Sequence, residues 1–378
     1  MFQNVQKIIG RTLLNLPGYH TRRKIVVIES DDWGGIRMPS IEVFQKLQKQ
    51  GFKPENDPYL KYDSLASEED LSNIFEVLNS VKDKNGNPAI ITANCVVANP
   101  DFKKIREHNF QKYFYEPFTE TLKKYSNHQN SFNLWKDGIN NNLFYPQFHG
   151  REHLNVDRWL KGLQAGDTLL HAAFENEMIS ISSMPCEMRF GYMEALDFYS
   201  EEEKINKYEI IIEGLKLFEQ IFEVHSESFI ANCYIWHKDI EDTLFENKVK
   251  YIQGNPIQIQ PNIRGDVRFV SKKYHFTGQK NMIGQIYLVR NAHFEPSQYP
   301  NEDVVNNCLN RIEIAFRWNK PAIISSHRLN FIGTIDVKNR DYNLILFSEL
   351  LKEIKRKWPT VEFMTSDELG QLISADYE

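Results

Sequence analysis

The amino-acid sequence predicts an α/β fold in which about seven strand–helix steps form a barrel. Short apolar segments rich in Val and Ile alternate along the 378 residues with longer amphipathic segments, which is the pattern of βα units around a parallel sheet. The number of these steps suits a (β/α) barrel. A doubly wound open sheet is the alternative, but the glycine-rich phosphate-binding sequences that such sheets usually carry are absent.

Apolar, β-branched composition marks the expected strands, and helical spacing of apolar residues marks the expected helices. The strands are expected at Lys24–Glu29, Ala89–Val97, Leu143–Phe148, Ser228–Ile235, Lys250–Gln253, Lys280–Arg290 (a strand or a hairpin arm), Ala322–Ser326 and Val361–Met364. The helices are expected at Ser40–Gln50, Asn155–Leu163, Thr168–Glu177, Ser200–Phe222, Asp239–Asn247, Asn301–Trp318 and Arg340–Trp358. Ser40 is an expected N-cap, and Ser200 with Glu203 predicts a capping box.

We expect a single domain over residues 1–378, with the barrel core at about 24–369. Long insertions interrupt the strand–helix alternation at about 110–142, 164–199 and 256–280. Polar, aromatic and turn-forming residues dominate the first and last of these stretches. Insertions of this kind lie over one face of a barrel, where substrate loops are found.

Composition and charge exclude several classes of protein. The 45 Lys+Arg and 51 Asp+Glu give a net charge of -6, which argues against a nucleic-acid partner. No apolar run reaches the roughly 18–20 residues that span a bilayer, and the first residues lack the pattern of a signal peptide. The four cysteines are far apart in the sequence, which favours reduced thiols. We therefore expect a cytoplasmic protein without a transmembrane segment.

Two adjacent carboxylates, Asp31 and Asp32, follow the first expected strand directly. Buried carboxylates are costly unless a cation compensates them, and the carboxyl ends of barrel strands form the active face. A turn or helix cap is the alternative interpretation, because Asp and the following Gly34 and Gly35 favour turns.

A second candidate is the pair His149 and His153, which follows the strand Leu143–Phe148. On a regular strand these residues would be roughly 13 Å apart, which is too far for them to share an ion. They can bind one metal only if the chain turns just after the strand. With 11 His in the chain, such a pair occurs by chance in roughly a third of comparable sequences.

The third candidate is His327, at the end of the strand Ala322–Ser326. Alone it would be interpreted as a strand-end His with a backbone partner. However, all three candidates fall at strand carboxyl ends, so they would meet at one face. Together they supply an open three-ligand metal site and further groups for acid–base chemistry.

These residues resemble the polysaccharide deacetylase (NodB-homology) family. That family has a strand ending in Asp-Asp, a His-(Ser/Thr)-x-x-His motif and a late strand ending in His, which correspond here to Asp31–Asp32, His149–His153 and His327. The resemblance covers most of residues 24–369 in order, with long insertions.

The resemblance implies a distorted (β/α) barrel and a metal-dependent hydrolase that removes an N- or O-linked acetyl group from a carbohydrate or glycan precursor. It implies a divalent metal, most commonly zinc, held by Asp32, His149 and His153. Asp31 would then be the general base, and His327 would protonate the leaving group.

The sequence departs from the family pattern at two places. Gly150 replaces the usual Ser or Thr, and Ile230 or Ala231 occupies the position of an arginine that orients the catalytic Asp in the family. Candidates for a replacement are Arg37, Arg151 and Arg189. These departures motivate a catalytically silent carbohydrate-binding barrel as one alternative function. A metal-dependent amide or ester hydrolase with a non-sugar substrate is another.

Aromatic and polar residues near the motifs are candidates for contact with a sugar. We expect substrate contacts from Trp33, Asn232, Tyr234 and Trp236, although core packing also explains aromatic residues at such positions. The stretch His293–Glu295 is better interpreted as a loop than as part of the site. The oligomeric state does not follow from the sequence.

Overall fold

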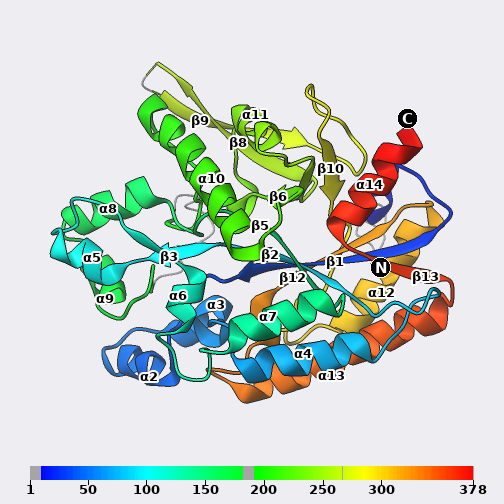
Figure 1. Cartoon of the computed structure of the whole chain (residues 1–378), viewed down its shortest axis with the longest axis horizontal. Helices are drawn as coiled ribbons and strands as arrows, with labels where there is room; N and C mark the ends of the chain where they lie inside the picture. Colours follow the sequence, from blue (N-terminus) through cyan, green and yellow to red (C-terminus); the bar gives the residue numbers. More distant parts are fainter. Residues whose placement is uncertain (1–9, 182–190, 266, 378) are drawn as a thin grey trace.

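A parallel sheet lies at the centre of the computed structural model, which describes residues 10–181, 191–265 and 267–377 (Figure 1). The strand order is β10-β7-β6-β5-β2-β1-β12-β11, and β13 pairs with β1. The nine strands are β1 (Lys24–Trp33), β2 (Ile91–Cys95), β5 (Phe144–Phe148), β6 (Ser228–Ile230), β7 (Tyr251–Gly254), β10 (Ile286–Val289), β11 (Ala292–His293), β12 (Ala322–His327) and β13 (Val361–Met364). Each pairing within this sheet is parallel, which confirms the predicted α/β class.

Helices pack against the sheet, and Figure 1 shows α4, α7 and α13 together along one side of it. The helices are α2 (Ile41–Lys49), α3 (Pro58–Tyr62), α4 (Glu68–Asn79), α5 (Phe102–Glu107), α6 (Phe118–Leu122), α7 (Ser131–Asn140), α8 (Val156–Gln164), α9 (Thr168–Phe174), α10 (Glu201–Phe222), α11 (Asp239–Glu246), α12 (Val304–Arg317), α13 (Val337–Lys357) and α14 (Ser366–Tyr377). Short 3₁₀ turns occur at Pro54–Asn56, Asn232–Tyr234 and Arg328–Phe331. Within the described parts of the chain, every helix is too short or too polar to cross a bilayer.

The helix caps follow the sequence in part. The Ser40 side chain caps α2 as predicted, by accepting from a backbone N–H. At α10 the Ser200 hydroxyl accepts from the N–H of Glu203. The Glu203 carboxylate, however, accepts from Tyr199, one residue before the expected partner, so the predicted capping box is only half formed.

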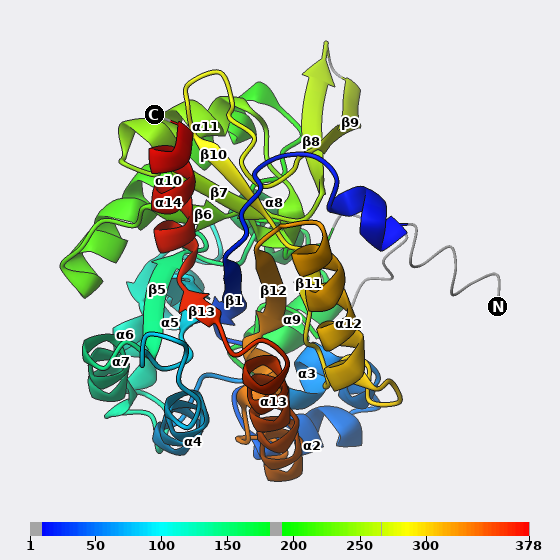
Figure 2. The ribbon, with the colours of Figure 1, turned by 90° about the vertical axis from the view of Figure 1, so that its right-hand side faces the viewer.

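The predicted insertions contain regular structure that the sequence analysis did not assign. Two antiparallel pairs lie outside the central sheet, namely β3 (Ala98–Pro100) with β4 (Tyr115–Pro117), and β8 (Ile257–Arg264) with β9 (Val267–Tyr274). The β8–β9 hairpin fills most of the predicted insertion 256–280 and projects from the molecule (Figure 2). The side chains of β9 are largely exposed, and the buried residues of β8 include the polar Gln258 and Gln260, so the hairpin lacks the apolar signal of a buried strand.

One segment joins the two ends of the strand order. Residues 286–293 pair first with β7, as β10, and then with β12, as β11. Between these pairings the backbone N–H of Arg290 donates to Gly254, and that of Asn291 donates to Ile323. This crossing places Arg290 between the two edges of the sheet.

Both faces of β1 are buried, as expected for a central parallel strand. Val26 and Ile28 belong to the larger apolar cluster, whereas Ile25 and Val27 belong to a second cluster that includes residues of α14. Because side chains alternate along a strand, Glu29 continues the face of Ile25 and Val27. This face carries carboxylates where the strand approaches its carboxyl end.

Candidate metal centre and active site

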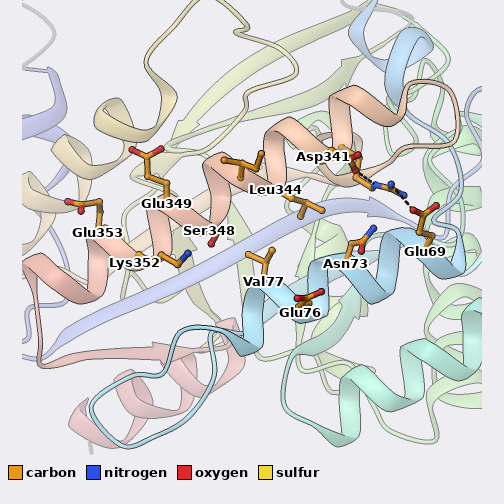
Figure 3. Close-up of a pocket in the computed structure, with 12 residues that line it drawn as sticks. Glu69, Asn73, Glu76, Val77, Asp341, Leu344, Ser348, Glu349, Lys352 and Glu353 are labelled. Carbon is orange, nitrogen blue, oxygen red and sulfur yellow. Dashed lines mark hydrogen bonds and ion pairs between the residues drawn. The ribbon is translucent and has the colours of Figure 1, made fainter.

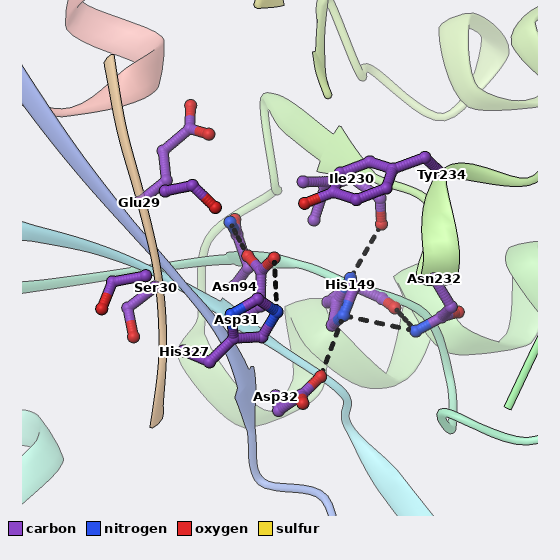
Figure 4. A network of polar contacts seen from close by, with 12 residues as sticks. Glu29, Ser30, Asp31, Asp32, Asn94, His149, Ile230, Asn232, Tyr234 and His327 are labelled. Carbon is purple, nitrogen blue, oxygen red and sulfur yellow. Dashed lines mark hydrogen bonds and ion pairs between the residues drawn. The ribbon is translucent and has the colours of Figure 1, made fainter. Parts of the chain in front are cut away.

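Asp31 and Asp32 lie at the carboxyl end of β1, where a bulge interrupts the pairing with β2. The register is regular up to Ser30 and has shifted at Trp33. Asp32 has a φ of 73°, a left-handed conformation that few non-glycine residues adopt. Neighbouring side chains on a regular strand point to opposite faces. The bulge re-aims Asp32, so both carboxylates face one group of polar side chains (Figure 4).

The chain turns directly after β5, and this turn brings His149 and His153 together. Gly150 has a φ of 115°, which glycine tolerates much better than other residues do. The two imidazole ring centroids lie 5.2 Å apart. The turn is a loop and not a helical turn, but it meets the condition on which the predicted ligand pair depends.

Asp32, His149 and His153 form a buried cluster with the composition of a metal site. Oδ1 of Asp32 lies 3.4 Å from Nε2 of each histidine, and the three candidate ligand atoms lie within 4.8 Å of one another. In a tetrahedral zinc site, bonds of about 2.0–2.1 Å place neighbouring ligand atoms about 3.3–3.4 Å apart. The two separations from Asp32 match this value. The donor set therefore fits a divalent cation.

The surroundings of the two imidazole rings are compatible with binding of a metal ion through their Nε2 atoms. Nδ1–H of His149 donates to the Ile230 carbonyl at 2.9 Å, which places the lone pair of the ring on Nε2. This Nε2 lies 3.4 Å from Oδ1 of Asp32 and 3.4 Å from the amide nitrogen of Asn232. The Asn232 amide donates to the His149 carbonyl at 2.9 Å. Nδ1 of His153 is buried without a hydrogen-bond partner among the described residues. Burial lowers the pKa of His153 to about 3, so the neutral, metal-binding form is present at neutral pH.

Arg37 engages the second oxygen of Asp32. Its Nη2 donates to Oδ2 at 3.2 Å, and its Nε lies 3.6 Å from Asp63. Asp63 also accepts two hydrogen bonds of 2.9 Å from Arg328. Burial alone would raise the pKa of Asp32, but the charge of Arg37 above all holds it well below its usual range. Asp32 is thus ionised, with Oδ1 directed toward the histidines.

Asp31 lies beside the cluster and binds a buried arginine with both oxygens. Nη1 of Arg290 donates to Oδ2 at 2.7 Å, and Nη2 donates to Oδ1 at 2.6 Å. The Asn94 amide also donates to Oδ1, at 2.8 Å. Burial alone would raise the pKa of Asp31, but Arg290 lowers it to about 2. Asp31 is therefore ionised at neutral pH.

The arginine partner of Asp31 comes from a position that the sequence analysis did not name. Arg290 follows β10, outside every motif. Of the three expected candidates, Arg37 contacts the neighbouring carboxylate, and Arg151 pairs with the next residue in the chain. Arg189 lies outside the described residues. The only sequence signal was a charged residue at the end of an expected strand.

His327 ends β12 and is the register partner of Asp31. Its Nε2 lies 3.8 Å from Oδ2 of Asp31, and its Nδ1 lies 2.6 Å from a Glu295 oxygen. The Asn330 amide fixes Glu295 by donating to its other oxygen at 2.8 Å. Burial alone would lower the pKa of His327, but Glu295 raises it to about 9. His327 is therefore protonated at neutral pH. Glu295 lies in a loop, as expected, but this loop reaches the site, so its exclusion from the site is wrong.

Two of the four expected substrate contacts are excluded by burial. Trp33 and Trp236 are each 1% exposed and belong to the apolar core. The Trp33 ring packs edge-on against Phe144, and the Trp236 N–H donates to Glu241 at 3.0 Å. Neither ring offers a face to a sugar, so these two predictions are corrected. At Trp33 the bulge turns the ring into the core.

The other two residues lie at the site. Asn232 is buried and holds the His149 carbonyl, so it contacts a candidate ligand. Tyr234 is partly exposed, and its hydroxyl accepts from Nη1 of Arg290 at 3.0 Å. Tyr234 thus stays a candidate for substrate contact.

A separate groove of about 880 Å³ lies between α4 and α13 (Figure 3). Its lining includes Glu69, Glu76, Glu349 and Arg340. None of the predicted metal-binding or catalytic residues lines it. The chemistry-bearing residues are therefore at the strand ends and not in this groove.

Comparison with known proteins gives similarity of overall structure only. No family model and no curated protein sequence matches the chain. A probable polysaccharide deacetylase from Pseudomonas aeruginosa PAO1 is 7% identical with a TM-score of 0.48, over 93% of this chain and 91% of that one. PuuE allantoinase is 9% identical with a TM-score of 0.46, over 94% and 93%. A 4-alpha-glucanotransferase from Thermococcus litoralis is 10% identical with a TM-score of 0.44, and the match spans 92% of this chain but 40% of that protein. Values this low carry no conclusion about activity.

Proposed function

We propose that the protein is a metal-dependent hydrolase that removes an N- or O-linked acetyl group from a carbohydrate or glycan precursor. One observation carries this proposal: an ionised carboxylate, Asp31, and a protonated imidazole, His327, lie 3.8 Å apart beside a cluster of metal-ligand type. Hydrolysis of an amide or ester needs a base for the attacking water and an acid for the leaving group. Asp31 would supply the base and His327 the acid, which their lowered and raised pKa values support.

Asp32, His149 and His153 would hold a divalent cation, and two imidazoles with one carboxylate are a ligand set that suits zinc. Such a cation lowers the pKa of water and polarises a carbonyl group. Arg37 keeps Asp32 ionised, and the Ile230 carbonyl keeps the His149 lone pair available. These contacts hold two of the three candidate ligands in place.

Asp31 and His327 would divide the proton transfers between them. Asp31 is ionised, and its Oδ2 would accept the proton of the attacking water. His327 carries a proton on Nε2, which it would give to the leaving amine or alcohol. Glu295 keeps that proton in place by bonding to Nδ1.

Three broader expectations belong to this proposal. The sheet would close as a distorted barrel, which the passage of residues 286–293 from β7 to β12 supports. The chain would form one domain. A cytoplasmic location would favour a nucleotide-linked or lipid-linked sugar precursor as substrate.

A second candidate function is a metal-dependent amide or ester hydrolase with a non-sugar substrate. The burial of Trp33 and Trp236 favours it, because two expected stacking surfaces for a sugar are absent. The catalytic residues and their roles would be the same. Only the substrate would differ.

The test is release of acetate by the purified, zinc-loaded protein. We expect release from one or more acetylated mono- or oligosaccharides, and loss of release after removal of the metal by a chelator. Release from simple acyl amides or esters but from no acetylated sugar would favour the second function. No release from either group, with metal bound, would contradict both.

A further inference from the structure

We propose that Arg290 is the positioning residue of the Asp31 carboxylate, and that Glu29 in turn holds Arg290. This inference rests on the proposed function for the role of Asp31. In the family that the sequence resembles, an arginine near β6 orients the catalytic Asp, but this sequence has Ile230 or Ala231 at that position. We assign the same task to Arg290, which lies between β10 and β11.

The guanidinium fixes the plane of the Asp31 carboxylate. Two parallel hydrogen bonds of 2.6 and 2.7 Å join the two groups, which is the bidentate geometry that only arginine provides. A hydrogen bond to only one of the two oxygens would leave the Asp31 carboxylate free to rotate about its Cβ–Cγ bond. The paired contact removes that freedom.

The hydrogen bonds also make the two Asp31 oxygens different. Oδ1 accepts from Arg290 and from Asn94, whereas Oδ2 accepts from Arg290 alone among the residues that the structure describes. Oδ2 is also the oxygen 3.8 Å from Nε2 of His327. Arg290 therefore presents to the reacting side the oxygen that still has a free lone pair.

Glu29 binds the Nε side of the Arg290 guanidinium, away from the Nη atoms that bind Asp31. Nε of Arg290 donates to Oε2 of Glu29 at 2.5 Å, and the Ser366 hydroxyl donates to Oε1 at 2.8 Å. Glu29 is fully buried and lies two residues before Asp31, on the same face of β1. One guanidinium thus bridges two carboxylates of a single strand.

This arrangement exceeds what neutralising Asp31 would require. A lone Arg290–Asp31 pair would already balance the charge, so neutrality does not require the second carboxylate, Glu29, on the same guanidinium. Nη1 of Arg290 also donates to Tyr234 and Ser325. Contacts on every side of the guanidinium fix its orientation, and the backbone N–H of Arg290 is itself bonded to Gly254. These contacts serve orientation more than charge.

The test compares Arg290→Lys and Glu29→Gln with Arg340→Lys as a matched control. Arg340 is also buried and bridges two carboxylates, Glu69 and Asp70, neither of which belongs to the proposed site. We expect Arg290→Lys to lower kcat about 100-fold and Glu29→Gln about tenfold, with KM changed less than about threefold, because a misplaced group costs rate and not binding. Metal content should stay unchanged. Arg340→Lys should lower the Tm but keep kcat within about twofold.

Crystal structures of the same variants give a readout that needs no substrate. The Asp31 carboxylate should rotate away from its wild-type plane in Arg290→Lys. An Asp31 that keeps its orientation there overturns the proposal, whatever the rate. If Arg290→Lys does not fold, the Glu29→Gln structure decides in the same way. If the wild-type protein releases no acetyl group, the proposed function fails, and the orientation of Asp31 still tests the positioning role.

Discussion

His327 and Glu295 form a short charged hydrogen bond, with 2.6 Å between Nδ1 and the carboxylate oxygen. The bond joins the end of β12 to the segment after β11. It gives His327 a proton at neutral pH and directs Nε2 toward Asp31. The acid and the base of the proposed reaction are thus defined by different neighbours, Glu295 for one and Arg290 for the other.

The leaving group should reveal the role of His327. We expect His327→Ala to lower kcat by about 10²–10⁴-fold on an acetylated sugar, because the departing amine or alcohol needs a proton. The loss should be much smaller on an aryl acetate, whose leaving group departs as a stable anion. His171→Ala is the control, since His171 bonds to the Leu163 carbonyl away from the site. Equal losses on both substrates would contradict the acid role.

Asp31→Asn should give a different pattern. The amide keeps the shape but cannot accept a proton, so kcat should fall by about 10²–10⁴-fold on both substrates. Zinc content should stay at the wild-type value, because Asp31 is not one of the three candidate ligands. A variant that retains most of its turnover would remove Asp31 as the base.

The stability of the metal-free protein should depend on pH through His327. Its pKa is raised to about 9 in the folded state, compared with about 6.5 in the unfolded chain. The stabilisation is therefore complete below about pH 6.5 and is lost as the pH rises through about 9, by up to about 3 kcal/mol. Chemical denaturation at pH 6 and pH 9.5 measures this loss. Glu295→Gln should abolish most of it, and an unchanged pH dependence would contradict the pairing.

Gly150 should be required for the position of the two histidines. A Cβ there would lie 3.1 Å from Oδ1 of Asn232, at a φ of +115°. Gly150→Ala should therefore lower both the unfolding free energy, by about 2–3 kcal/mol, and the zinc affinity. Gly86→Ala is the matched control, because Gly86 has a φ of +86° but open space around it. It should cost about 1 kcal/mol and leave zinc binding unchanged; equal zinc affinities in the two variants would contradict this prediction.

The sequence predicted the elements that carry a local signal. Apolar runs identified β1, β5 and β12, and the polar residues at or just past their carboxyl ends are the ones that meet there. Parallel strands bring their carboxyl ends to one edge of the sheet, so the sequence alone predicted that Asp32, His149 and His153 form one metal site. The β8–β9 hairpin was missed because β9 is largely exposed and the alternate buried residues of β8, Gln258 and Gln260, are polar, so neither strand produces an apolar alternation.

Residues whose partners are distant in the sequence were not predictable in this way. Arg290 meets Asp31 across 259 positions, and Glu295 meets His327 across 32, with no motif spacing in either case. Trp33 was assigned to the substrate because it follows the Asp pair. The bulge at Asp32 changes the alternation at that point, and only the folded chain shows that the ring enters the core.

The most direct test of the central claim is an anomalous-scattering map at the zinc edge from crystals of the zinc-loaded protein. The geometry predicts one strong peak within bonding distance of Asp32 Oδ1 and of Nε2 of His149 and His153, and loss of that peak in His149→Ala and His153→Ala. A map without a peak between these three atoms, or a peak that survives both substitutions, would contradict the proposed metal centre.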